Sequence, residues 1–459
     1  MVPELVADDR TFRWLLRGVM WSSLFAWSGL LVGCGSDEGG SDAPQNPRAC
    51  EPEGAPEERD VTGVWIPVDI EGAECADGSQ YRVFVKYARS SHDVVVTFEG
   101  GGACWDYATC SGQSTRGASN TDGIEPNHMV ALPPPLGDDP EARGWAYLHP
   151  HFGASDPDAP TAEEHQVFFP YCTGDVFAGN VEVDYENPDG GEPLRMRHRG
   201  RANVEAAIPW LRDEFPEIGR LLVTGCSAGG VATLVNYDLL RSELEPLCGY
   251  ALDDSGPIMS EEGSSGALLG TVREAWQLDD LLESLDDSLG APDGAGTQDD
   301  FGNLLGLLSE AYPEDRFSVT LFGRDLNFSL FSYQLFYDDP PDDELYELWD
   351  AEVSALRERI EELPNVGYFM PAFRPDNCSH CLSILPINQL SNPEYFINTL
   401  RGESDTYLGT ELPENDTELR FDDALQNLLS NEPLFELYEE PGAGDRFDED
   451  DSLACHAGD

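Results

Sequence analysis

Short apolar runs in the first half of the chain predict buried strands. Their β-branched and aromatic residues are typical of strands, and they occupy residues 81–87, 94–98, 166–171 and 221–224. Between the last two runs, residues 201–214 carry apolar side chains at helical spacing, namely Val204, Ala207, Ile208 and Leu211. This alternation of strands and helices predicts an α/β fold with a mostly parallel central sheet and helices on both faces.

The second half of the chain continues this alternation. Residues 316–322 and 367–372 predict strands, and the aromatic-rich run at 330–337 also has the composition of a strand. Residues 342–363 are acidic with apolar positions at helical spacing, which predicts an amphipathic helix. The Asp- and Gly-rich residues 280–301 predict a surface insertion.

The N-terminus has the pattern of an export signal. Three arginines precede an apolar segment at 18–33, which is short for a permanent membrane span and typical of a signal-peptide core. The segment ends in a sequence that resembles a bacterial lipobox, so Cys34 is the predicted lipidation site, and Gly35 after it favours the outer membrane. The alternative is an ordinary cleaved signal peptide with secretion.

Composition divides the chain into four segments. Residues 1–33 form the predicted signal peptide of the lipoprotein type. Residues 34–60 are rich in Gly, Ser, Asp, Pro and Glu, which is typical of a flexible tether. Residues 61–431 hold the predicted catalytic domain, and residues 432–459 predict an acidic, loosely ordered tail.

The charge of the chain is strongly negative. It has 26 Lys and Arg against 88 Asp and Glu, a formal net charge of −62, and Lys86 is its single lysine. Such a chain repels nucleic acid and anionic lipid, so a bacterial membrane is an expected partner only through the lipid anchor. The acidity favours a solvated surface suited to high salt; an acidic binding face or calcium sites are the alternatives. The acidic cluster at 448–451 lacks the ligand spacing of a calcium loop, and we predict no metal.

Eleven cysteines in an exported chain predict disulfides. Without Cys34 there are ten, and Cys104 and Cys110 are close enough in sequence to form a local clamp. The spacing leaves the other pairings open. Cys378-x-x-Cys381 could instead bind zinc or act in redox chemistry, but a single histidine lies beside it and the chain has no second pair of this spacing.

The strand predicted at 221–224 runs into the sequence Gly-Cys-Ser-Ala-Gly-Gly at 225–230, and a helix-compatible stretch follows at 231–241. This is a G-x-S-x-G motif in a strand–turn–helix context, which is a nucleophile elbow with Ser227 at its apex. Glycine flanks the serine because the turn leaves no room for a Cβ. The motif predicts a serine hydrolase.

Ser227 needs a histidine to remove its proton and a carboxylate to fix that histidine's tautomer. In α/β-hydrolases the chain order is Ser, acid, His, and two histidines follow Ser227. His456 lies in the predicted tail, so His380 is favoured as the base. Asp338, after the predicted strand at 330–337, is the favoured acid because active sites form at the carboxyl ends of parallel strands. Asp339 is its rival.

A glycine-rich loop follows another early strand. Residues 94–98 run into Glu99-Gly100-Gly101-Gly102, which resembles the oxyanion loops of lipases and esterases. Backbone N–H groups of Gly101 and Gly102, together with that of Ala228, could bind the oxyanion of an acyl-transfer reaction. A phosphate-binding loop is less favoured, because the chain has neither G-x-G-x-x-G nor a following Lys-Ser/Thr here.

These segments together resemble the pectin acetylesterase family, which includes the animal Wnt deacylase Notum. The matching stretches lie within residues 61–400 and follow the family's order: 98–104 through Cys110, 170–179, 225–230, 252–256, 337–338 and 378–380. The resemblance implies an α/β-hydrolase-like three-layer fold, a triad of Ser227, Asp338 and His380, and no cofactor. Plant members carry Trp at the position of Ala103 and Notum carries Trp at that of Gly102, so the family's substrate pocket does not transfer directly.

The sequence as a whole predicts an exported serine carboxylic-ester hydrolase, anchored by lipid to the outer membrane or cell surface. By resemblance, its substrate is an acylated polysaccharide from which it removes O-acetyl groups. A lipid-acyl ester is the alternative substrate. A surface binding protein on a hydrolase scaffold without catalysis is the alternative from another functional class.

Overall fold

The structure is a computed structural model that describes residues 50–114, 116–129, 160–337, 342–371, 380–383, 425–426, 428–429 and 438–439. The chain divides into two units, 1–46 and 47–459, and every described residue belongs to the second. Several predicted positions lie outside the described residues: the signal segment, Cys34, Asp338, Asp339, Cys378 and His456. Among the described residues, no helix has the length and apolar character needed to cross a membrane.

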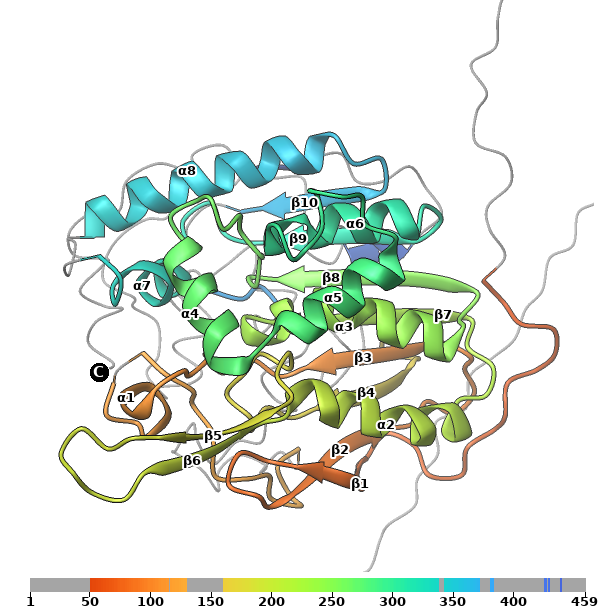
Figure 1. Cartoon of the computed structure of the whole chain (residues 1–459). Helices are drawn as coiled ribbons and strands as arrows, with labels where there is room; N and C mark the ends of the chain where they lie inside the picture. Colours follow the sequence, from red (N-terminus) through yellow and green to blue (C-terminus); the bar gives the residue numbers. More distant parts are fainter. Residues whose placement is uncertain are drawn as a thin grey trace, which may run out of the picture. The chain divides into compact units, whose positions relative to one another are not determined.

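In the described part of the chain, nine strands form one sheet in the order β1-β2-β4-β3-β7-β8-β9-β10-β11 (Figure 1). They are β1 (Trp65–Glu74), β2 (Gln80–Lys86), β3 (Val94–Phe98), β4 (His165–Phe169), β7 (Arg220–Cys226), β8 (Cys248–Asp254), β9 (Arg316–Thr320), β10 (Val366–Met370) and β11 (Tyr438–Glu439). Strand β2 runs antiparallel to β1 and β4, and each strand from β4 to β11 in this order is parallel to its neighbour. A separate antiparallel hairpin consists of β5 (Val181–Tyr185) and β6 (Leu194–His198).

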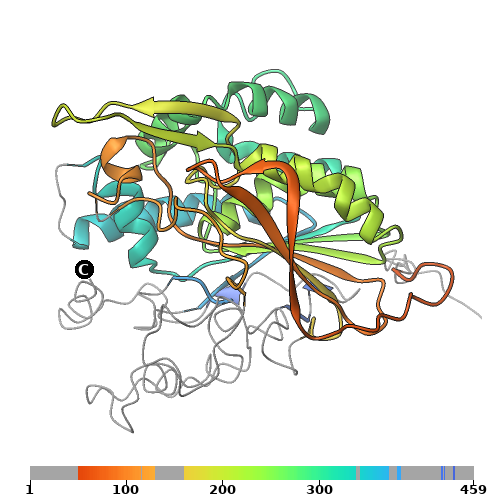
Figure 2. The ribbon, with the colours of Figure 1, turned by 90° about the horizontal axis from the view of Figure 1, so that it is seen from below.

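Helices connect the parallel strands, as the alternating pattern predicts. They are α1 (Tyr107–Cys110), α2 (Gly200–Glu214), α3 (Ala228–Leu244), α4 (Gly266–Trp276), α5 (Asp279–Leu289), α6 (Leu304–Ala311), α7 (Leu326–Tyr333) and α8 (Asp342–Glu361), with a short 3₁₀ turn, η4 (Phe301–Asn303). Helices α2, α3, α5 and α6 lie on one face of the sheet (Figures 1 and 2), and α8 packs beside β10. The predicted fold class, an α/β-hydrolase-like arrangement around a mostly parallel sheet, is confirmed.

The register of the sheet aligns the carboxyl ends of its parallel strands. Phe98 pairs with Gly225, Cys226 pairs with Asp254, and Asp254 pairs with Thr320. The central strands are apolar and buried along their length; all five residues of β3 are buried, as expected for a parallel strand that is covered on both faces. The loops that follow β3, β7, β8 and β9 therefore emerge side by side at one edge.

One predicted strand is a helix. The aromatic run at 330–337 overlaps α7 (Leu326–Tyr333), so the prediction of a strand there is wrong. Asp325 is the N-cap, and its side chain accepts a hydrogen bond from the Phe328 N–H. The buried residues of α7 include Leu326, Leu330 and Tyr333, which repeat at helical spacing. The apolar face and the cap outweigh the strand preference of the aromatic residues.

The predicted surface insertion at 280–301 is only partly a surface loop. Helix α5 fills its first half, with Leu282, Leu285 and Leu289 buried against the core.

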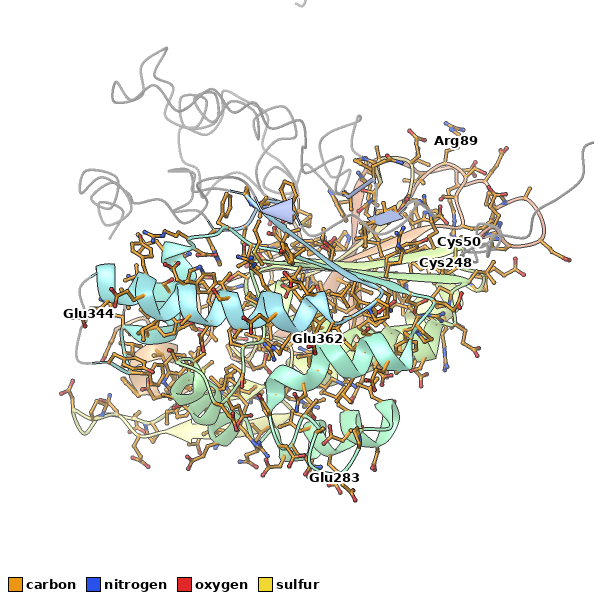
Figure 3. The ribbon with its side chains drawn as sticks, turned by 90° about the horizontal axis from the view of Figure 1, so that it is seen from above. Cys50, Arg89, Cys248, Glu283, Glu344 and Glu362 are labelled. Carbon is orange, nitrogen blue, oxygen red and sulfur yellow. A yellow bond between two sulfur atoms is a disulfide. The ribbon has the colours of Figure 1, made fainter. Side chains whose placement is uncertain are left out.

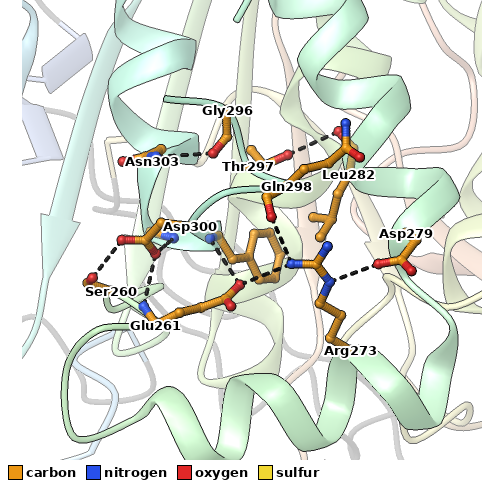
Figure 4. A network of polar contacts seen from close by, with 12 residues as sticks. Ser260, Glu261, Arg273, Asp279, Leu282, Gly296, Thr297, Gln298, Asp300 and Asn303 are labelled. Carbon is orange, nitrogen blue, oxygen red and sulfur yellow. Dashed lines mark hydrogen bonds and ion pairs between the residues drawn. The ribbon is translucent and has the colours of Figure 1, made fainter. Parts of the chain in front are cut away.

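A polar network holds the rest of that insertion in place (Figure 4). Asp300 accepts hydrogen bonds from Ser260 Oγ (2.5 Å) and from the Glu261 N–H (2.9 Å). Arg273 of α4 forms ion pairs with Glu261 (3.6 Å) and with Asp279 (2.8 Å). The insertion is therefore anchored to the segment that follows β8.

The predicted tether does not extend over all of residues 34–60. Cys50 forms a disulfide with Cys248 at the start of β8 (Figure 3). Arg59 pairs with Glu214 at the end of α2 (2.7 Å). Residues 50–60 are therefore attached to the strands and helices of the second unit. In the segment predicted as a tail, Tyr438–Glu439 form β11, which pairs with β10.

The acidic side chains of the helices mostly face outward. Glu283 of α5, Glu344 of α8 and Glu362 after α8 are exposed at the periphery of the unit (Figure 3). This placement fits the prediction of a solvated acidic surface.

Candidate active site

Ser227 occupies the sharp turn between β7 and α3. Its backbone has φ 58° and ψ −119°, a conformation that is strained for a residue with a side chain and is typical of functional sites. A Cβ on Gly225 or Gly229 would collide with backbone atoms, including Phe98 O in both cases. The glycines of the motif are required because strand β3 passes this close to the turn. The predicted nucleophile elbow is present.

The glycine loop after β3 lies directly against the elbow. A Cβ on Gly100 would lie 2.6 Å from Cys226 O and 3.4 Å from Ser227 Cβ. Gly101 and Gly102 have φ values of 144° and 65°, which favour glycine strongly. Ala228 is the first residue of α3, so its N–H has no partner within the helix. The loop and the helix N-terminus therefore meet beside Ser227, as the sequence predicted.

His380 lies in a described segment at the same edge of the sheet and is 6% exposed. Its Nδ1 forms a hydrogen bond of 2.7 Å with Asp325 Oδ2. Asp325 therefore provides a carboxylate for His380, whereas Asp338, which the sequence predicted, lies outside the described residues. Asp325 is fully buried and follows β9.

Two carboxylates determine the charge state of His380. Burial lowers the pKa of the imidazole, but the charge of Asp325, its hydrogen bond and the charge of Asp254 together raise that pKa above the usual 6.5. Burial raises the pKa of Asp325, and His380 together with backbone N–H groups at the start of α7 partly offsets this. The site thus favours a protonated imidazole more strongly than water does.

A disulfide joins the neighbours of Ser227 and His380. Cys226 precedes the serine, Cys381 follows the histidine, and the two are bonded across 155 residues of sequence. Both sulfurs and a ring nitrogen of His380 lie within 4.8 Å of one another. Because Cys381 is bonded to Cys226, it does not form the zinc or redox pair with Cys378 that the sequence left open. The predicted Cys104–Cys110 disulfide is confirmed, and a further bond links Cys75 to Cys172.

Several known proteins have sequences similar to part of this chain. Residues 154–285 match the family model described as Pectinacetylesterase. Pectin acetylesterase 5 of Arabidopsis thaliana is 30% identical over 182 residues, which cover 38% of this chain and 36% of that protein. Pectin acetylesterase 4 of the same plant is 29% identical over 180 residues, 38% of each chain. The palmitoleoyl-protein carboxylesterase Notum of Drosophila melanogaster is 25% identical over 214 residues, 44% of this chain and 29% of that protein.

These matches agree with the resemblance to the pectin acetylesterase and Notum family that the sequence shows. The matched region spans less than two fifths of the length of each of these curated relatives. The fold agrees with that of a solved family member, the Wnt deacylase Notum from Drosophila. That structure is 19% identical and covers 81% of this chain and 95% of its own, with a TM-score of 0.50.

One stretch that carries the family resemblance, residues 170–179, has a structural role here. Asp175 is fully buried and accepts hydrogen bonds from the Gly179 N–H (3.1 Å), the Gly200 N–H (2.7 Å) and Thr173 Oγ1 (2.5 Å). Burial raises the pKa of this carboxyl to about 6, against the effect of these donors. Asp175 therefore fixes the start of α2.

Sequence reasoning missed two carboxylates at this site, those of Asp325 and Asp254. Asp325 follows a strand that was predicted correctly at 316–322, and its position at the end of that strand was the available signal. Asp254 and Ser255 belong to the stretch at 252–256 that carries the family resemblance, but no strand was predicted before them and no role was assigned to them. Asp254 ends the parallel strand β8, Ser255 follows it, and Asp325 follows the parallel strand β9, at the edge where Ser227 lies.

Proposed function

We propose that the chain is a serine carboxylic-ester hydrolase whose catalytic triad is Ser227, His380 and Asp325. The observation that carries this proposal is the buried hydrogen bond between His380 and Asp325, at the sheet edge where the elbow and the glycine loop meet. A carboxylate that fixes the tautomer of a histidine is the part of a triad that a binding protein does not need.

In the proposed reaction, Asp325 accepts a hydrogen bond from the N–H at His380 Nδ1. Nε2 therefore carries the lone pair that accepts the proton of Ser227 Oγ. The oxygen attacks the carbonyl carbon of the ester. The N–H groups of Gly101, Gly102 and Ala228 bind the oxyanion that develops. The tetrahedral intermediate collapses, and the alcohol leaves with the proton from His380.

A water molecule then completes the cycle. His380 removes a proton from the water, which attacks the acyl-enzyme, and a second tetrahedral intermediate forms. Its collapse releases the carboxylic acid and returns the proton to Ser227. Each proton passes through His380, so no metal or cofactor takes part in any step.

We propose an O-acetyl group on a polysaccharide as the substrate, which the pectin acetylesterase relatives support. The similarity to a palmitoleoyl-protein carboxylesterase supports a lipid-acyl ester as the second candidate. We also propose export with a lipid anchor at Cys34. The four disulfides in the described part of the chain support an oxidising compartment.

Hydrolysis of p-nitrophenyl acetate in high salt tests the proposed activity. We expect turnover by the wild type and by Ser242→Ala, a control at an exposed serine of α3, and none by Ser227→Ala. Labelling by a serine-directed fluorophosphonate should follow the same order. Wild-type protein without Ser227-dependent turnover or labelling would exclude the esterase.

A chain-length series of p-nitrophenyl esters separates the two substrate candidates. Highest kcat/KM with the acetyl ester supports an acetylesterase. A maximum at long acyl chains supports a lipid deacylase and contradicts the first candidate.

A further inference from the structure

Asp254, the last residue of β8, contacts the elbow of Ser227, the loop of His380 and the end of β9, the strand that leads to Asp325. It is fully buried, as is Ser255 after it. Ser255 has a positive φ of 56°, which is strained for a residue other than glycine and occurs where the surrounding structure holds it. The mechanism above gives neither residue a role.

The backbone of this pair supports the nucleophile and the acid. The Ser227 N–H donates to Asp254 O (2.8 Å), which holds the elbow against the end of β8. The Ser255 N–H donates to Thr320 O (2.7 Å) at the end of β9, the strand that leads to Asp325. These two hydrogen bonds attach the loop of Ser227 and the strand before Asp325 to the end of β8.

The side chains of the pair hold the loop of the base. Three successive N–H groups after His380 point at them. The Cys381 N–H donates to Ser255 Oγ (3.0 Å), the Leu382 N–H to Asp254 Oδ1 (2.9 Å) and the Ser383 N–H to Asp254 Oδ2 (2.7 Å). Successive backbone N–H groups that converge in this way form an anion-binding nest, and the carboxylate of Asp254 occupies it.

The donors around Asp254 show that the nest is built for a negative charge. Thr320 Oγ1 lies 3.2 Å from Oδ1, and Ser255 Oγ lies 3.4 Å from the same oxygen. Burial raises the pKa of Asp254, while the N–H groups of Ser383 and Leu382 and the charge of His380 favour the ionised carboxyl and partly offset this effect.

The preceding residue provides a contrast. Asp253 is equally buried, but among the described residues its Oδ2 has no hydrogen-bond partner. Burial raises the pKa of Asp253 well above the usual 3.8.

We propose that Asp254 is a positioning residue that holds the loop of His380 against the elbow of Ser227 and presents a negative charge to the imidazole. This proposal rests on the proposed esterase function. Among the described residues, the groups that face His380 include the carboxylates of Asp325 and Asp254, the ring of Phe328 (6.4 Å between centroids) and the Cys226–Cys381 disulfide. Asp254 is the second carboxylate in that set. It ends β8, whereas Asp325 follows β9.

Asp254→Asn tests the proposal, with Asp253→Asn as the matched control on the same strand. The Asn side chain presents an NH₂ to one of the two N–H donors and carries no charge. We expect kcat to fall about 100-fold, as it does for small displacements of catalytic groups, while KM stays near its wild-type value. The acid limb of kcat/KM should move to lower pH, because the imidazolium loses a stabilising charge. Asp253 is not among the charges that raise the pKa of His380, so Asp253→Asn should leave the acid limb in place.

The pKa of His380 provides a readout that does not depend on turnover. It is measured by NMR titration of protein that carries ¹⁵N-labelled histidine, with the signal assigned by His380→Gln. A lower pKa in Asp254→Asn than in the wild type and in Asp253→Asn supports the proposal even if no ester is hydrolysed. An unchanged pKa and an unchanged acid limb in a folded Asp254→Asn would overturn it.

If Asp254→Asn does not fold, Ser255→Gly decides the positioning role. Glycine relieves the positive φ and removes the acceptor of the Cys381 N–H. A lower kcat at unchanged KM and unchanged acid limb supports the proposal. Wild-type kcat in this variant contradicts it.

Discussion

Replacing Asp325 by Asn separates the acid in the structure from the one that the sequence predicted. Asp325 uses one oxygen to cap α7 through the Phe328 N–H (2.8 Å) and the other to bind His380 Nδ1 (2.7 Å). Asn caps helices about as well as Asp, so we expect α7 to form and the variant to fold. The amide then presents an N–H donor to His380 Nδ1, which must accept it.

The consequence for catalysis follows from the tautomer. When Nδ1 accepts a hydrogen bond, the hydrogen of neutral His380 lies on Nε2, which can no longer take the proton of Ser227. This exchange in a Ser-His-Asp triad lowers kcat by about 10⁴-fold. Since each factor of ten corresponds to about 1.4 kcal/mol, the barrier rises by about 5 kcal/mol.

The test measures initial rates of p-nitrophenyl acetate hydrolysis. Circular dichroism and thermal melting show whether each variant is folded. Asp338→Asn is the matched variant and should keep wild-type kcat. The reasoning fails if folded Asp325→Asn retains more than about a tenth of wild-type kcat. It also fails if Asp338→Asn is the variant that loses activity.

Three further predictions concern the disulfide, the pH profile and the glycine loop. The double substitution Cys226→Ala and Cys381→Ala opens a loop of 155 residues, so the free energy of unfolding in urea should fall by up to about 5 kcal/mol; an unchanged value would contradict this. Because the pKa of His380 is raised and the base must be neutral, kcat/KM should fall as pH drops, with a midpoint above 6.5. A midpoint below that value would show that the two carboxylates do not act on the imidazole. Gly100→Ala places a Cβ 2.6 Å from Cys226 O and should lower kcat about 10²-fold by displacing the oxyanion donors. Its control is Gly270→Ala in α4, where a Cβ meets no atom within 4 Å, and equal activity of the two variants would refute the role of the loop.

The parts of the site that depend on local geometry could be predicted from the sequence. Gly225 and Gly229 are required by the turn itself, and the glycine loop follows a strand of five buried residues, so both motifs stand out without knowledge of the fold. The strand at 330–337 was predicted wrongly because aromatic residues favour strands as well as buried helices. An Asp three residues before Phe328, followed by Leu at 326 and 330, was the capping signal that predicts a helix there.

The contacts between distant segments could not be predicted. The Cys226–Cys381 bond depends on β7 and the loop after β10 meeting at one edge of the sheet, and ten cysteines allow many pairings. The role of Asp254 depends in the same way on the register between β7, β8 and β9. No spacing in the chain encodes either contact.

Two disulfides in the described part of the chain, Cys50–Cys248 and Cys226–Cys381, overlap in sequence. This overlap sets the order in which the parts of the site can come together. Cys75–Cys172 can close within the span of Cys50–Cys248, whereas Cys226–Cys381 crosses that span and needs a partner from much later in the chain. Synthesis proceeds from the N-terminus, so the glycine loop and the elbow are made long before the loop of His380. In the proposed esterase, the serine therefore has no base until the segment of His380 has been synthesised, and ester cleavage requires that this segment has folded against the sheet edge and that Cys381 has been oxidised with Cys226.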